Sequence, residues 1–167
     1  MPSIYPAAKL KTILEECYRL LVPGGVLELL LINPIPSANA GPSLQNWVDT
    51  NLTLKLERKY ISTRPNVLLP MLCDEIGLST GKETGNAAAG SDYGAQLDFS
   101  FPITVDCPTE NFEDGVACEV GRHLYSSMWS SHLDHPPFWE NVDILEECRE
   151  RECEFQCTFL YAVKPSR

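Results

Sequence analysis

Five side chains that could bind or activate a small acceptor lie close together late in the chain. They are His123, Tyr125, Trp129, His132 and His135. Aromatic rings can stack on a flat acceptor, and histidine titrates near neutral pH, as a general base requires. One hypothesis is a substrate lid, with His123, Tyr125 and Trp129 as pocket candidates. The simpler interpretation is an amphipathic helix packed on a sheet, because aromatic residues at helical spacing usually belong to a core.

The same region offers the donor types of a zinc site. These donors are His132 and His135 together with Cys148, Cys153 and Cys157. Structural zinc sites commonly contain two cysteines separated by two residues, and the chain contains no such pair. Cys157 also stands in a run that alternates with apolar residues. We therefore expect no metal site.

Asn33 is our first candidate for a residue near a pocket. The segment Asn33-Pro34-Ile35-Pro36 follows a short apolar run, and a strand-ending turn is its simpler interpretation, because proline cannot donate to a sheet ladder. The carboxyl ends of strands in open α/β sheets nevertheless face the ligand crevice. Trp47, on the inner face of the next predicted helix, is a further pocket candidate.

Hydrophobic periodicity predicts the elements of the first half. A helix follows Pro6 and stops at Pro23-Gly24, with Leu10, Leu14, Cys17 and Leu21 on its apolar face. The run 26–32 hardly alternates, which predicts a strand buried on both faces. Ser43 is expected to cap a helix that carries Leu44, Trp47, Val48, Leu52 and Leu56 inward. A helix over about 65–76 is expected to bury Val67, Leu68, Met71, Leu72 and Ile76.

The second half is predicted in the same way. Residues 79–94 are rich in small and polar residues and predict a flexible surface loop. Residues 96–105 predict a strand at the edge of a sheet, because Pro102 limits the pairing of this strand. Residues 107–114 predict an acidic loop. Helices are expected over about 116–133 and 137–151. In the second helix the side chains expected to point inward are Trp139, Val142, Leu145 and Cys148. Glu146 and Glu147 are expected on its solvated face. Residues 154–163 alternate, with Phe155, Cys157, Phe159, Tyr161 and Val163 against Gln156, Thr158, Leu160 and Ala162, which predicts an antiparallel strand.

Composition narrows the function classes. The chain has 167 residues, 44% of them hydrophobic, which suits one globular domain. Acidic residues outnumber basic ones 23 to 13, so neither nucleic acid nor an anionic membrane is an expected partner. The first residues do not resemble an export signal, and the longest apolar run is too short to span a bilayer. We therefore expect a cytoplasmic protein whose seven cysteines are reduced thiols.

Three segments in this order resemble the C-terminal half of class I S-adenosylmethionine-dependent methyltransferases, in particular fungal enzymes of secondary metabolism. They are ILEECYRLLVPGGVLELLLINPIP (13–36), LQNWVDTNL with RPNVLLPMLCDEIGL (44–52 and 64–78), and VGRHLYSSMW with ILEECRERECEFQCTFLYAVK (120–129 and 144–164). The resemblance implies an α/β fold. It would be an incomplete Rossmann-like sheet of the family's late strands, the last one antiparallel, with several packing helices in a single domain over residues 1–167.

The chain lacks the sequence features with which the family binds its cofactor. Family members place a glycine-rich loop after their first strand and an acidic residue after the second. The chain contains no GxGxG pattern, so we assign no cofactor-binding residue and expect no S-adenosylmethionine binding by this chain alone. Asn33-Pro34-Ile35-Pro36 is similar to the Asn-Pro-Pro-aromatic motif of amino-methylating enzymes, but that motif follows strand four rather than five. In related enzymes the region around His123 to Trp129 contributes to the acceptor pocket.

Two functions from different classes follow. The first is methyl transfer to a small-molecule acceptor, with the chain, as a truncated form, inactive by itself. The second is a non-catalytic interaction subunit, because a half sheet exposes an edge where a further strand should lie. The chain would then form a homo-oligomer, or a hetero-oligomer with a full-length methyltransferase. In either assembly the strand 26–32 is expected to be flanked on both sides.

Overall fold

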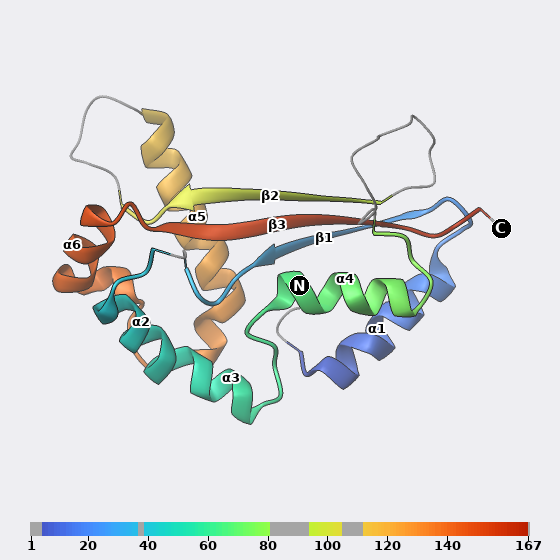
Figure 1. The fold of residues 1–167 in the computed structure, drawn as a ribbon, viewed down its shortest axis with the longest axis horizontal. Coiled ribbons are helices and arrows are strands. Elements are labelled where there is room, and N and C mark those ends of the chain that lie inside the picture. The colour runs from blue at the N-terminus through green and yellow to red at the C-terminus, as the bar shows by residue number, and fades with distance from the viewer. Residues whose placement is uncertain (1–4, 37–38, 81–93, 105–111, 167) are drawn as a thin grey trace.

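A computed structural model gives the fold, and it describes residues 5–36, 39–80, 94–104 and 112–166. At the centre is a three-stranded sheet in the order β1-β3-β2, made of Val26–Ile32, Glu154–Val163 and Ala95–Pro102 (Figure 1). β3 is antiparallel to both neighbours, so β1 and β2 run parallel to each other on its two sides. The molecule is therefore of mixed α/β type, and the prediction of an antiparallel last strand is confirmed.

Successive side chains of β3 point to opposite sides, which gives the sheet two faces. We call the face with Phe155, Cys157, Phe159 and Tyr161 face A, and the face with Leu160 and Ala162 face B. The register places four side chains of β1 on face A, namely Val26, Glu28, Leu30 and Ile32. Four side chains of β2 join them there, namely Ala95, Leu97, Phe99 and Phe101.

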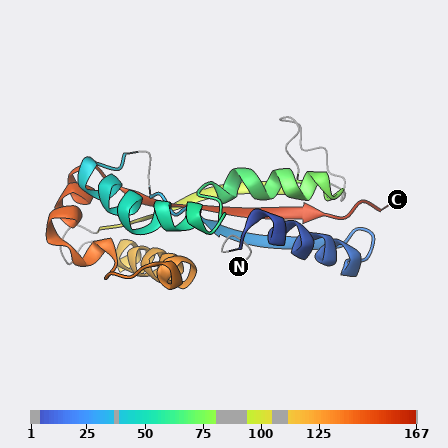
Figure 2. The same ribbon diagram turned by 90° about the horizontal axis from the view of Figure 1, so that it is seen from below.

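Face B is covered by α1 (Ala7–Leu20) and α4 (Pro65–Glu75), as Figures 1 and 2 show together. Their buried side chains form one core with β1 and β3, which contains Leu10, Leu14, Leu29, Leu31, Leu69, Leu72, Cys73 and Leu160. A Pro-Gly-Gly turn joins α1 to β1. Gly24 adopts a φ of 75° there and donates its N–H to the Lys164 carbonyl at 2.8 Å, which fixes the turn to the end of β3.

A second helical layer continues from β1. It consists of α2 (Pro42–Val48), a π-helical turn over Asp49–Thr53, and α3 (Leu54–Arg58). The inner side chains predicted for it are buried, with exposed fractions of 1% or less at Leu44, Val48, Leu52 and Leu56. The cap was predicted wrongly. Gly41 occupies the N-cap position and has no side chain to cap with.

Face A is covered in part by α5 (Phe112–Trp129), which crosses the sheet near the carboxyl ends of β1 and β2 (Figure 1). Gly121 makes this close packing possible, because a Cβ atom there would lie 2.6 Å from Phe101 Cβ and 2.8 Å from Phe155 Cδ2. Short 3-10 turns, Ser130–His132 and Phe138–Glu140, then lead to α6 (Val142–Glu150). Tyr125, Trp129 and Phe138 fill the core beneath them.

The structure corrects several predicted positions. β1 is not buried on both faces, since Val26 is 48% exposed and Glu28 is exposed, because β1 is an edge strand that α5 covers only near its end. Val67, Met71 and Val142 are exposed rather than inward. Helix α4, for example, turns Leu69 and Cys73 toward the sheet instead. Residues 81–93 of the predicted loop 79–94, and residues 107–111 of the predicted loop 107–114, lie outside the described residues.

Helix α5 begins at Phe112, so the end of the predicted acidic loop is helical. Within the described part of the chain, no helix is long and apolar enough to cross a membrane.

Candidate functional site

The carboxyl ends of β1 and β2 lie at the same edge of the sheet, because the two strands are parallel. Side chains of α5 bind both ends. The Tyr125 hydroxyl donates to the Pro34 carbonyl at 2.7 Å, just after β1, and the Arg122 guanidinium donates to the Ile103 carbonyl at 3.0 Å, just after β2. We call this region, with Asn33 and Trp129, the carboxyl-end site.

One polar atom of this site, in the side chain of Asn33, has no hydrogen-bond partner among the described residues. The backbone N–H of Asn33 donates to the Gln156 carbonyl at 2.9 Å, which extends the β1–β3 ladder by one residue. Its side-chain Oδ1 is buried and accepts no hydrogen bond within the described residues. An orphaned buried acceptor costs free energy, and such atoms often receive a water molecule or a ligand.

Trp129 and Tyr125 lie one helical turn apart on the inner face of α5, and both are fully buried. The indole Nε1 of Trp129 is buried without an acceptor among the described residues. Burial raises the pKa of Tyr125 far above its ordinary value, so its hydroxyl stays neutral and acts as a donor. Tyr125 also contacts Phe138 and Phe155, with ring centroids 5.7 and 5.2 Å away.

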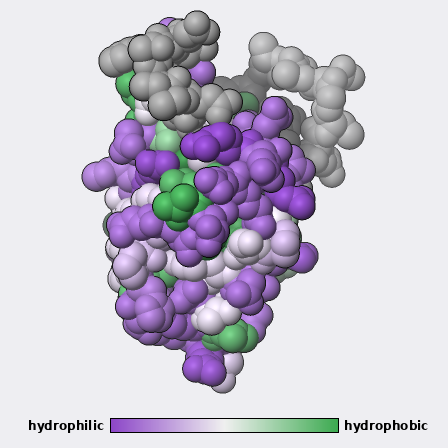
Figure 3. All heavy atoms as spheres, turned by 90° about the vertical axis from the view of Figure 1, so that its left-hand side faces the viewer, coloured by the Kyte–Doolittle hydropathy of each residue, from purple (hydrophilic) through white to green (hydrophobic). Residues whose placement is uncertain are grey.

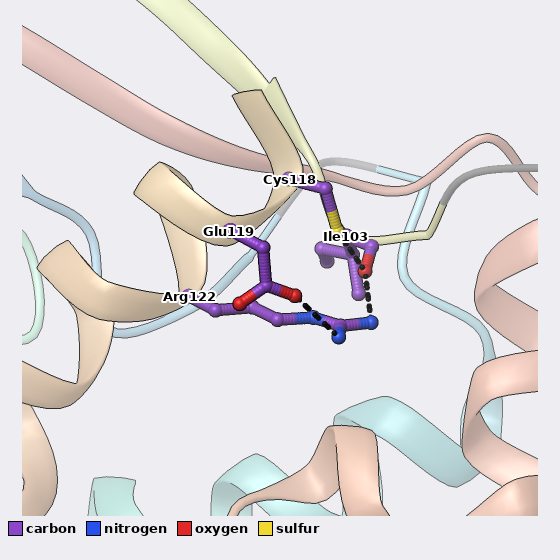
Figure 4. A network of polar contacts seen from close by, with 4 residues as sticks. All are labelled: Ile103, Cys118, Glu119 and Arg122. Atoms are coloured by element: carbon purple, nitrogen blue, oxygen red, sulfur yellow. Dashed lines mark hydrogen bonds and ion pairs between the residues drawn. The ribbon is translucent and has the colours of Figure 1, made fainter. Parts of the chain in front are cut away.

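Arg122 was not among the residues predicted from sequence. Figure 4 shows its side chain between Glu119 and Ile103. Its guanidinium also reaches the Glu119 carboxylate at 3.3 Å, and the Cys118 thiol donates to the same Ile103 carbonyl at 3.2 Å. The Arg122 Nε is buried and has no described partner. The only signal in the sequence is a cation on a helix face that otherwise carries Cys118, Tyr125 and Trp129.

The predicted histidines do not converge. His123 is exposed, because it lies on the outer side of α5 while Tyr125 points inward. His132 Nδ1 lies 3.2 Å from Lys59 Nζ, and burial together with this cation lowers the pKa of His132. His132 is therefore neutral at pH 7. The structure places the Tyr125 hydroxyl on the Pro34 carbonyl, beside Asn33, and places Trp129 in the same core cluster as Ile32 and Tyr125. It leaves His123 exposed.

Trp47 lies at a different place, the end of the molecule formed by α2 and α6. Its ring meets Phe138 edge-on at 5.4 Å and lines a surface hollow of about 550 Å³ together with His135, Glu140 and Asp143. Figure 3 views this end and shows a mainly hydrophilic surface with small separate hydrophobic patches. The hollow can hold water or a polar group, but it is not continuous with the buried atoms of Asn33 and Trp129 in any contact that the structure describes.

The cysteines considered as zinc ligands are buried thiols. Burial raises the pKa of Cys148 and of Cys157 to about 12, which keeps both protonated and unreactive. In the described segments, no group of three or more His, Cys, Asp or Glu residues could hold a metal ion.

Glu147 is partly buried, although it was predicted to lie on a solvated face. Its carboxylate accepts hydrogen bonds from the backbone N–H groups of Ser43 at 3.0 Å and Leu44 at 2.9 Å, and so caps α2 from α6. This contact fastens the segment that follows Asn33 to the last helix. Comparisons of the chain with models of protein families, with curated proteins and with solved structures gave no match.

Proposed function

We propose that this chain forms the C-terminal half of a Rossmann-like class I S-adenosylmethionine-dependent methyltransferase sheet. The chemistry of the whole would be methyl transfer to a small-molecule acceptor in fungal secondary metabolism. The observation that carries the proposal is the position of β3, an antiparallel last strand between two strands that are parallel to each other. An antiparallel last strand is what the resemblance of the sequence implies.

The connections of the sheet support the same proposal. The chain passes from β1 to the parallel strand β2 through α2, α3 and α4, and parallel strands require such a crossover. Helices lie on both faces of the sheet, α1 and α4 on face B and α5 on part of face A, which is typical of open α/β folds. Because ligands of these folds bind beyond the carboxyl ends of the strands, the acceptor is expected at the carboxyl-end site.

Within this site, Asn33 and Trp129 offer unused hydrogen-bonding atoms, an acceptor and a donor respectively. They would orient the methyl acceptor, since methyl transfer depends largely on positioning. Tyr125 is a positioning residue, because its hydroxyl already holds the Pro34 carbonyl next to Asn33. A cytoplasmic location fits this chemistry.

The residues present do not fit S-adenosylmethionine. The described glycines with positive φ are Gly24 and Gly77. Gly24 lies in the turn between α1 and β1, and Gly77 follows the end of α4, so neither of them links a strand to a helix. The N–H of Gly24 is also already bound to the Lys164 carbonyl. The cofactor loop would therefore have to come from other sequence, encoded upstream or carried by another chain.

A second candidate function, an interaction subunit, is favoured by the free edge of β1. Asn33 N–H donates to Gln156 and Lys164 N–H to Gly25, so the odd-numbered residues of β1 form the hydrogen-bonded pairs with β3. The N–H and C=O groups of Val26, Glu28, Leu30 and Ile32 consequently point away from the sheet. No described backbone group binds them, so a strand of a second copy or of a full-length methyltransferase could pair there.

Equilibrium dialysis against radiolabelled S-adenosylmethionine tests the first candidate. We expect no saturable binding by the 167-residue chain. We expect saturable binding and methylated product once the chain is extended by the reading frame that precedes it in the DNA. Saturable binding by a monomer of the chain alone would contradict the assignment of the missing site, and an extended chain that still fails to bind would overturn the methyltransferase proposal.

Sedimentation velocity tests the second candidate, for the chain alone and mixed with a full-length methyltransferase. Val26→Pro removes an N–H group that points to the free edge while leaving the β1–β3 hydrogen bonds intact. We expect it to abolish a complex that the wild type forms. Leu54→Gln, at an exposed apolar side chain of α3, is the control. Equal association by both variants would exclude pairing at this edge.

A further inference from the structure

Face A of the sheet carries an apolar surface beyond α5. The cross-strand row Ile32, Cys157 and Phe99 lies nearest to α5, and its first two side chains are 1% and 2% exposed. The next row, Leu30, Phe159 and Leu97, is open, with Phe159 37% and Leu97 56% exposed. The row after it contains Glu28, Tyr161 and Ala95. We call these last two rows the open half of face A.

Aromatic packing makes the open half one continuous surface. Phe159 stacks on Phe99 at 5.1 Å with an interplanar angle of 20°, and Tyr161 follows at 6.3 Å on the other side. Phe99 in turn meets Phe101 edge-on beneath α5. A row of four aromatic rings therefore runs from the buried part of face A into the exposed part.

Helix α5 forms a wall beside this surface. Arg122 faces the Ile103 side of α5, toward the carboxyl end of β2. The helical period places Ala117, Val120 and Leu124 on the opposite flank, toward the open half. Val120 is 40% exposed, and Leu124 is partly buried against the core. The floor and one wall of the surface are thus apolar.

The dimensions of this surface suit a helix. Successive rows on one face of a sheet are about 7 Å apart. Packed helices lie about 8–10 Å apart, so one helix can lie beside α5 above the two open rows. A second flat sheet would collide with α5, because stacked sheets lie about 10 Å apart and α5 already fills that space.

The charge of the open half of face A indicates what kind of helix would bind there. Glu28 is the one charged residue among the face A positions of the three strands, and none of the ion pairs between described residues involves it. The formal charge of the chain is -10, which disfavours a second copy on this face. We propose that the open half of face A docks an amphipathic helix of a partner protein, whose apolar stripe covers Phe159 and Leu97 and whose Lys or Arg pairs with Glu28.

This docking surface does not depend on methyl transfer or on the free edge of β1. Its test uses two synthetic helical peptides of about 18 residues, or five turns, with the same leucine stripe. One peptide carries lysine beside the stripe, and the other carries glutamate at the same positions. Fluorescence anisotropy of each labelled peptide is measured against the full 167-residue chain. We expect the lysine peptide to bind at least about tenfold more tightly than the glutamate peptide.

Three variants locate the binding. Leu97→Gln and Val120→Gln should each weaken the lysine peptide about tenfold, because each removes apolar contact area from the surface. Both side chains are exposed, so the fold should tolerate the changes. Glu28→Gln should reduce the preference for lysine over glutamate. Val142→Gln, at an exposed apolar residue of α6, is the matched control and should change nothing.

The proposal is overturned by any of three results. Neither peptide binds at millimolar concentration, or the two peptides bind alike, or Val142→Gln weakens binding as much as Leu97→Gln. A concentration-dependent dimer in sedimentation that Leu97→Gln abolishes would overturn it as well, because the occupant would then be a second copy of the chain.

Discussion

Glu147→Gln is expected to destabilise the protein by about 1 kcal/mol at neutral pH, the usual value of a lost helix cap. The four backbone positions at the start of helix α2 must each find a hydrogen-bond acceptor for an N–H group or lack that group. Pro42 has no N–H, Gln45 donates to the Gly41 carbonyl, and the N–H groups of Ser43 and Leu44 both bind the Glu147 carboxylate. Glutamine keeps one acceptor oxygen but loses the negative charge, which also interacts favourably with the positive end of the helix dipole.

The assay is urea unfolding followed by circular dichroism. A loss of about 1 kcal/mol, with an m value of about 2 kcal/mol per molar, lowers the unfolding midpoint by about 0.5 M. The neighbouring carboxylate provides the control. Glu146→Gln removes an exposed charge from the same helix and should leave the midpoint unchanged within error.

Acid should remove the difference between wild type and Glu147→Gln. Partial burial opposes ionisation of Glu147. The backbone N–H donors of Leu44 and Ser43, the Ser43 side chain and the charge of Arg151 together outweigh it and hold the pKa of Glu147 below its ordinary value of 4.5. A lowered pKa in the folded state means that the stabilisation is present above pH 4.5 and is lost as the pH falls through the folded-state pKa. A difference that persists unchanged in acid would show that packing, not charge, is responsible.

Gly41 gives a second check on the same geometry. A Cβ atom at Gly41 would occupy the position of the Glu147 carboxylate. Gly41→Ala should therefore expel the carboxylate, and its effect should be strongly non-additive with Glu147→Gln. Equal midpoints for wild type and Glu147→Gln at pH 7, or full additivity in the double mutant, would refute the cap.

Three further outcomes are expected. Gly121→Ala should lower stability by about 1–3 kcal/mol in urea unfolding, because its methyl group would collide with the sheet, whereas Gly115→Ala, with open space around it, should raise stability by about 0.5–1 kcal/mol. Tyr125→Phe should cost about 1–2 kcal/mol, since a buried carbonyl loses its donor; an unchanged midpoint would show that water replaces the hydroxyl. Burial raises the pKa of Cys73 to about 12, so peptide mapping after iodoacetamide treatment at pH 8 should find the half-buried Cys17 modified well before Cys73.

Local sequence patterns predicted the elements well because their physical causes are local. The bounds of β1 and β3 agree with the predicted strands, and α1 and α4 agree to within about two residues. The stop of α4 at Gly77 depends only on the ability of glycine to take positive φ, whereas α1 ends at Leu20, before the predicted stop at Pro23-Gly24. The alternation of 154–163 likewise needs only its own side chains to indicate a half-covered strand.

Features that depend on distant partners could not be predicted. The exposure of Val26 and Glu28 follows from how far along the sheet α5 extends, which no pattern within β1 encodes. The sequence of α6 does not indicate the capping role of Glu147, because the partners of its carboxylate are backbone groups 103 and 104 residues away in the chain. The candidate site was predicted in part. Tyr125 lies beside Asn33 and shares a core cluster with Trp129, while Arg122 was missed because its partner is a backbone carbonyl.

The central position of β3 has a consequence for synthesis of the protein. Among the described strands, β1 and β2 pair only with β3, which follows both of them in the chain. The sheet therefore cannot begin to form until β3 has been synthesised, and the apolar strand β1 must wait unpaired while all the elements between it and β3 are made. Such a chain depends on late, long-range pairing, which is slow and exposes it to aggregation. A stop codon before residue 154 would leave two strands with nothing to join them.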